Sequence, residues 1–200
     1  MENEGFFEKG VAANLFRKFL LKEFGEEVER GKEGEDIVCR IESRLGPQAR
    51  EMFSKPDVNA WYPVELMKEL YECVDKELSA RDPQILLKMG RHVADESARG
   101  FLRYLARLAS VRVLISRMKA FWKHYHKGGG VEAEIVRDEH GSKQGIVRVY
   151  GYPVAKPGGI AMQGFIEAIV KLAGARNLTI TPLQDFANSE DTFSWTLSWE

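Results

Sequence analysis

A change of hydrophobic period at the triple glycine Gly128–Gly130 divides this sequence and limits the folds open to it. Before the glycines, apolar residues recur at the three-to-four-residue spacing of amphipathic helices. After them, VEAEIVR and IVRVYGY alternate apolar and polar residues, as half-buried strands do. We therefore predict an α+β fold in which a helical half, residues 1–127, packs on a sheet half, residues 128–200.

The sheet half is predicted to follow the order β-β-α-β-β. The two alternating segments form a hairpin, and a helix follows over 160–173. NLTITPLQ and TFSWTLSW supply two more strands, which completes a four-stranded antiparallel sheet. No repeat or linker interrupts the 200 residues, so we expect one domain over 1–200.

The first predicted helix covers residues 8–24 and ends at Gly25. Its apolar residues lie nearly all round the axis, which is typical of a helix buried on more than one side. The second covering surface is either the rest of the domain or a second subunit. The second alternative predicts a homodimer formed through this N-terminal helix.

IVCRIESRLG fits either a short helix or a strand, and we favour the helix. Further helices are predicted in QAREMF and after Pro63, which occupies a first helical turn. Asp82-Pro83 is an N-cap and N1 pair that opens the next helix. Over residues 91–126 the apolar face rotates near Ser110. A straight helix cannot keep both faces in one core, so we predict a break there.

The charge composition excludes a chain built as a polycation for nucleic acid. Lys+Arg total 29 and Asp+Glu total 30, for a net charge of −1. The charges are unevenly placed, with −6 over 1–77, +8 over 78–127 and −3 over 128–200. The basic segment 99–127 fits nucleic acid, an acidic partner, an anionic ligand, or a solvated helix face paired with the acidic N-terminal region. We favour the solvated face and expect no nucleic-acid partner.

The chain shows no secretory signal and no long uncharged apolar stretch, so we expect a cytoplasmic protein without a membrane partner. Cys39 and Cys73 are too few for a disulfide scaffold, and no Cys/His cluster predicts a metal site. No GxSxG or phosphate-loop motif occurs, so no catalytic residue is predicted.

Four histidines are present, and none has a ligand partner at metal-binding spacing. His124 and His126 point to opposite sides of a helix and are expected at its polar end. His140 is expected in a solvated turn. His92 lies on a predicted helix beside apolar residues and is the one remaining candidate to ligate a haem iron.

Five segments in this order resemble one superfamily: KEFGEE, WYPVELMKELY, LLKMGRHVADESARGFLRYL, VYGYPVAKPGGIAMQGFIEAIVKLAG and SWTLSW. The superfamily contains the haem-based nitric oxide/oxygen sensor (H-NOX) domains, 4-vinyl-reductase-type domains and TRAPP trafficking subunits. The sequence is most similar to an uncharacterised haem-free bacterial family of that fold, of the myxobacterial type. The resemblance rests on packing motifs, so it implies the fold more than the function.

The resemblance also implies an expectation about haem. H-NOX domains carry a proximal histidine on a helix, but the matching stretch LRYLARLASVRVL has none. Their Tyr-x-Ser-x-Arg motif binds the haem propionates, but the matching strand begins Tyr150-Gly151-Tyr152-Pro153. We therefore expect no haem and no other cofactor.

The function that the resemblance implies is a non-enzymatic sensor or regulatory domain that binds a small apolar or amphipathic ligand or a signalling partner. The alternatives are a haem-based NO/O2 sensor, a TRAPP-type dimerisation scaffold and an enzyme of the 4-vinyl-reductase type. A pocket between helices and sheet is expected to be lined by apolar residues with a few polar tips. The candidates are Tyr62, Met67, Phe101, Tyr104, Met118 and Trp122.

Overall fold

The structure is a computed structural model that describes residues 5–29, 37–99, 110–139, 141–183 and 192–200. The helical half contributes α1 (Val11–Glu29), α2 (Ile37–Arg44), α3 (Pro47–Ser54), α4 (Val64–Leu78), α5 (Ile85–Arg99) and α7 (Val111–Tyr125). The sheet half contributes β4 (Gly130–Glu139), β5 (Ser142–Tyr150), α8 (Ala155–Leu172), β6 (Thr179–Pro182) and β7 (Phe193–Trp199). The predicted α+β class is confirmed.

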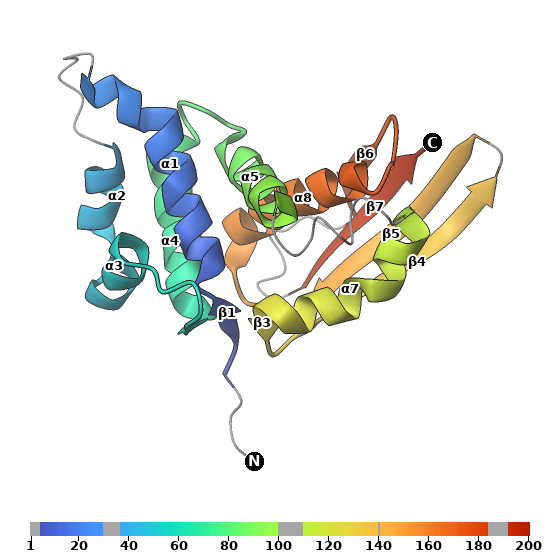
Figure 1. The fold of residues 1–200 in the computed structure, drawn as a ribbon, viewed down its shortest axis with the longest axis horizontal. Coiled ribbons are helices and arrows are strands. Elements are labelled where there is room, and N and C mark those ends of the chain that lie inside the picture. Colours follow the sequence, from blue (N-terminus) through green and yellow to red (C-terminus); the bar gives the residue numbers. More distant parts are fainter. Residues whose placement is uncertain (1–4, 30–36, 100–109, 140, 184–191) are drawn as a thin grey trace.

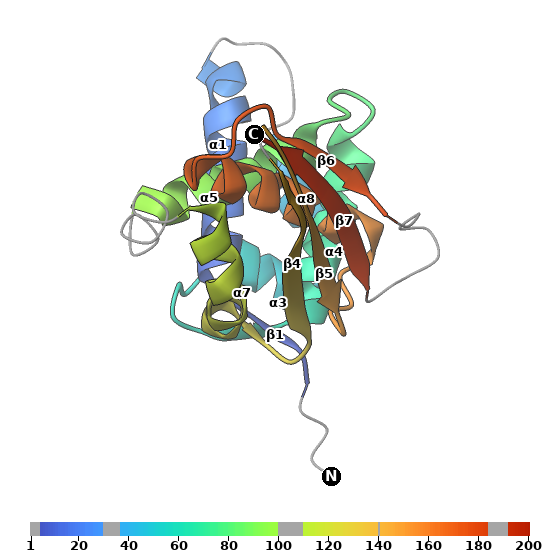
Figure 2. The ribbon, with the colours of Figure 1, turned by 90° about the vertical axis from the view of Figure 1, so that its right-hand side faces the viewer.

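The four strands of the sheet half form an antiparallel sheet in the order β4-β5-β7-β6. Alternation places Val147, Val149, Trp195 and Leu197 on its buried face. Helix α8 crosses that face, and α7 runs beside β4 (Figures 1 and 2). Helices α1 to α4 gather at the other end of the molecule (Figure 1). None of the described helices combines the length and apolar character needed to cross a membrane.

A second, small sheet lies within the helical half and was not predicted. It contains β1 (Phe7–Lys9), β2 (Trp61–Pro63) and β3 (His126–Lys127), in the order β2-β1-β3. Strands this short carry no readable alternation, so their pairing is not visible in the sequence. The central strand β1 thereby lies between a segment near α4 and the end of α7.

Several predicted boundaries need correction. Helix α1 continues through Gly25 to Glu29. Asp82 does not cap α5, which begins at Ile85; its carboxylate instead accepts the backbone N–H of Gln84 at 3.0 Å in the preceding turn. The break near Ser110 is confirmed, because Ser110 has an extended backbone and α7 begins directly after it.

The apolar residues of α1 are used within the chain. Ala13, Phe16, Phe19 and Leu20 are buried, while Leu21 is 38% exposed. Contacts with α2, α3 and α5 cover most of the helix. Packing within the chain therefore explains why apolar residues lie nearly all round the axis of α1. The homodimer stays a prediction.

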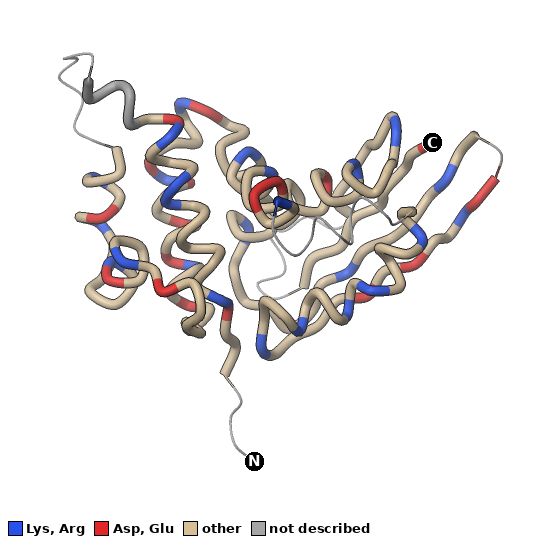
Figure 3. Tube along the Cα trace, in the orientation of Figure 1, with Lys and Arg blue, Asp and Glu red and all other residues tan. Residues whose placement is uncertain are grey.

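The basic residues of α7 lie on its solvent face, as expected, but the acid that pairs with Arg112 does not come from the N-terminal region. Arg112, Arg117, Lys119 and Lys123 are exposed (Figure 3). Arg112 pairs with Asp138 of β4 at 2.6 Å. The acid that pairs with Arg112 thus comes from the sheet half.

Candidate functional site

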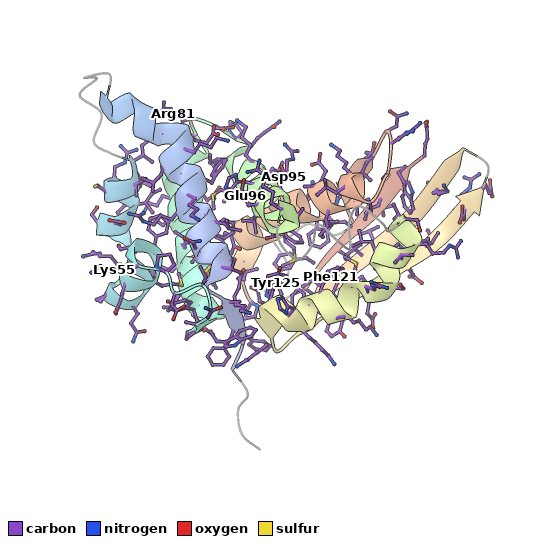
Figure 4. All side chains as sticks on the ribbon, in the orientation of Figure 1. Lys55, Arg81, Asp95, Glu96, Phe121 and Tyr125 are labelled. Carbon is purple, nitrogen blue, oxygen red and sulfur yellow. The ribbon has the colours of Figure 1, made fainter. Side chains whose placement is uncertain are left out.

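A cavity of about 130 Å³ lies between the helices and the buried face of the sheet. Its wall takes residues from α1, α4, α5, α7, α8, β1, β3, β4 and β5. Most of this wall is apolar, and its aromatic members are Phe16, Tyr71, Phe121, Trp122, Tyr125, Tyr152 and Phe165. Phe121 and Tyr125 lie on the side of α7 that faces α5 and α8 (Figure 4).

The helical stripe of α7 explains its share of the wall. Leu114, Met118, Phe121, Trp122 and Tyr125 recur at the spacing of one helix face. The indole N–H of Trp122 donates to the carbonyl of Gly128 at 3.0 Å, which fixes this ring at the end of the helix. Because Gly128 has a φ of +77°, its backbone suits glycine at this turn.

One corner of the cavity is polar, and the small sheet places it there. In β1 the side chains alternate, so Glu8 points inward between its neighbours Phe7 and Lys9. Glu8 is only 6% exposed and lies opposite His126 in the strand pairing. The hydroxyl of Tyr152, fully buried after β5, donates a hydrogen bond to Glu8.

Burial shifts the pKa values of this corner away from their ordinary ranges. Loss of water raises the pKa of Glu8 to about 7, against a smaller lowering by the Tyr152 hydroxyl. Burial lowers the pKa of His126 to about 3, so its imidazole is neutral. Burial, with a contribution from Glu8, raises the pKa values of Tyr71 and Tyr152 well above the ordinary range.

His126 differs from its predicted role as a solvated helix end. Its ring stacks on Trp122 with 4.1 Å between centroids, and contacts Tyr152 edge-on at 4.9 Å. Its Nδ1 atom is buried and has no hydrogen-bond partner within the described ranges. His124 is exposed, as expected, while His140 lies outside the described residues.

The structure places only some of the predicted pocket residues on the cavity wall. Met118 and Trp122 line the cavity. Met67 of α4 is fully buried in the core. The hydroxyl of Tyr62 accepts the backbone N–H of Asp57 at 3.1 Å. Neither residue is part of the cavity wall. Phe101 and Tyr104 lie outside the described residues.

Six polar members of the wall were missed as site residues: Glu8, Lys9, Tyr71, Ser97, His126 and Tyr152. Glu8 stands in an acidic N-terminal segment, which predicts exposure, and Tyr71 lies on the apolar stripe of α4, which predicts a packed core. The one available signal is the Phe-Phe-Glu-Lys-Gly run, in which a lone acid sits among strand-forming aromatic residues.

The described residues do not fit a haem. A cavity of about 150 Å³ engineered into another protein takes one benzene ring, whereas a porphyrin is a macrocycle of four pyrrole rings. The cavity of about 130 Å³ is therefore on the scale of a single ring. His92 lies against Phe19, with 5.4 Å between ring centroids, and is not part of the wall.

No group of three or more metal-ligating side chains occurs in the described part of the chain. Cys39 and Cys73 are not joined in a disulfide. Burial and the nearby Glu77 raise the pKa of Cys73, which disfavours a reactive thiolate.

The whole arrangement is similar to solved H-NOX structures. One is the Fe(II) unliganded H-NOX protein from K. algicida, with a TM-score of 0.65, 10% identity and coverage of 96% of both chains. A mutant of T. Tengcongensis H-NOX has a TM-score of 0.64 and 13% identity over 96% of this chain and 97% of that one.

The chain has the H-NOX fold. A third example, the S. oneidensis H-NOX protein in the Fe(II)NO ligation state, has a TM-score of 0.63, 11% identity and coverage of 96% and 99%. No known family profile and no curated protein sequence matches the chain. At these identities the likeness establishes the fold and leaves the ligand to be argued from the cavity.

Proposed function

We propose that this protein is a non-enzymatic sensor domain that binds a small, largely apolar ligand in the cavity between its helices and its sheet. The observation that carries the proposal is the cavity itself, which joins an apolar, aromatic wall to one polar corner. Ligand sites have this composition, because apolar walls supply affinity and a few polar groups fix orientation. The Fe(II), NO and oxygen-related names of the structural neighbours support a sensing role for this fold.

The cavity also offers a route from binding to response. Its wall is shared by α1 and α4 at one end and by α7, α8 and the sheet at the other. A ligand that contacts both groups favours the packing in which they close around it. We infer that a partner protein reads this change, and that no haem takes part.

Toluene tests the binding step, since one aromatic ring matches the size of the cavity. If toluene-saturated buffer holds toluene at about ten times its Kd, the folded state gains about 1.4 kcal/mol. For a domain of this size that raises the Tm by about 4 °C. Differential scanning calorimetry with and without toluene gives the shift.

Met118→Trp places a larger side chain on the wall and is expected to abolish the toluene shift while the protein stays folded. Lys119→Trp makes the same change on the solvent face of the same helix and should retain the shift. A shift of equal size in both variants would show that toluene acts elsewhere on the protein.

A further inference from the structure

The carboxyl group of Glu8 is buried without a basic partner. One oxygen, Oε2, accepts the hydrogen bond from Tyr152. Within the described part of the chain, nothing donates to the other oxygen, Oε1, and no lysine, arginine or histidine pairs with the carboxylate. Removing a carboxylate from water costs several kcal/mol unless a partner compensates it. The fold therefore presents an acceptor atom on the cavity wall that a bound group can satisfy.

Of the two lysines nearest to Glu8 in the small sheet, Lys9 contributes to the cavity wall, but the ammonium groups of both lysines lie over Trp61. Lys9 Nζ lies 5.9 Å from the centroid of Trp61, and Lys127 Nζ lies 4.5 Å from the same centroid. Trp61 is not part of the cavity wall. An anionic ligand would thus face Glu8, while the ammonium group of the wall residue Lys9 lies over Trp61.

The rings around Glu8 favour a cation. Tyr71, Trp122 and Tyr152 all line the cavity, and Trp122 and Tyr152 meet edge-to-face at 5.0 Å. The faces of such rings attract an ammonium group, and the attraction strengthens where water is excluded. Carboxylate and rings together select positive charge.

We propose that the ligand is a small amphipathic amine, with its apolar part in the cavity and its ammonium group donating to Glu8 Oε1. The inference rests on the proposed ligand-binding function and names the ligand class. The volume of about 130 Å³ limits the apolar part to about one ring or a short chain. Folding alone already removes water from Glu8, before any ligand binds. A bound ammonium group would therefore offset the free-energy cost of that desolvation.

The ionisation of Glu8 adds a pH dependence to this recognition. Burial raises the pKa of Glu8 to about 7, so the carboxyl is half protonated near neutral pH. Its neighbours Tyr71, Tyr152 and His126 stay neutral between pH 6 and pH 8, because burial raises the pKa values of the tyrosines and lowers that of the histidine. Amine binding should accordingly be tighter at pH 8 than at pH 6.

Benzylamine and toluene separate the charge from the ring, because they differ by one amino group. Isothermal titration calorimetry at pH 8 gives the Kd of each for three proteins: the native chain, Glu8→Gln and Glu132→Gln. Glu8→Gln keeps the shape of the side chain and removes its charge. Glu132→Gln removes an equal charge from an exposed position on β4.

We expect Glu8→Gln to weaken benzylamine binding about tenfold or more, the loss of a hydrogen bond to a charged group. Toluene should bind all three proteins alike, and Glu132→Gln should bind benzylamine as the native chain does. Equal benzylamine affinity in the native chain and Glu8→Gln would overturn the amine inference and leave the cavity proposal standing. Failure of both compounds to bind the native chain would overturn both proposals.

Discussion

Glu8→Gln is expected to stabilise the folded protein by about 3 kcal/mol at pH 8, and by far less at pH 4. The pKa of Glu8 rises from 4.5 to about 7 on folding, mainly because burial disfavours the charged form. Below pH 4.5 the carboxyl is protonated in both the folded and the unfolded state, and its burial carries no charge penalty. As the pH rises to about 7 the unfolded chain ionises first, so the folded state loses stability. Glutamine stays neutral and escapes this loss.

The titration of His126 changes the folding stability with pH in the opposite direction to that of Glu8. Its pKa falls from 6.5 to about 3 on folding, so its contribution is lost as the pH falls through that range. In the native chain the two groups offset each other between pH 4.5 and pH 6.5. Glu8→Gln leaves His126 unopposed, and its stability should therefore fall more steeply with acid.

Urea unfolding at pH 8 and pH 4 measures both effects, with Glu132→Gln as the exposed control. If Glu8→Gln proves less stable than the native chain at pH 8, the buried carboxylate has a compensating partner. The claim that Glu8 lacks such a partner would then be wrong.

Gly90→Ala is expected to destabilise the protein by about 3 kcal/mol. Gly90 lies where α5 crosses α8, and a Cβ atom there would overlap the backbone oxygen of Ala161 and lie 2.8 Å from its carbonyl carbon. On α8, Gly164 makes the reciprocal approach, with its Cβ position 2.9 Å from the carbonyl carbon of Leu87. Since backbone atoms cannot rotate aside, the two helices must separate. The usual gain from replacing a helical glycine by alanine, about 1 kcal/mol, is far smaller.

Asp95→Ala, on the exposed face of the same helix, provides the control and should change stability by less than about 0.5 kcal/mol. Chemical denaturation of both variants tests the prediction. A Gly90→Ala protein as stable as the native chain would mean that α5 and α8 do not cross this closely.

The long elements of the fold were predictable because each carries a complete hydrophobic period. The stripe of α4 and the alternation of β5 each place apolar residues on one face, and both elements lie where the sequence predicts them. The small sheet was not predictable. Its strands have two or three residues, and they bring together Phe7, Pro63 and Lys127 from distant parts of the chain.

The candidate site shows the same division. Met118 and Trp122 could be chosen because they stand on the stripe of α7, and that stripe faces the cavity. Met67 stands on an equally clear stripe of α4, but its side chain packs in the filled core. A period identifies the buried face of a helix, and it does not tell whether that face meets packed side chains or open space. The position of Glu8 on the cavity wall depends on the pairing of β1 with β2 and β3, which cannot be predicted from the sequence.

Methionine-methyl NMR during a toluene titration tests the central claim most directly, because the chain carries its own controls. Met118 and Met162 line the cavity, whereas Met52 and Met67 are buried in the core away from it. An aromatic ring bound in the cavity should shift the Met118 and Met162 methyl resonances and leave those of Met52 and Met67 in place. Unchanged Met118 and Met162 resonances at toluene saturation would contradict the cavity as a ligand site.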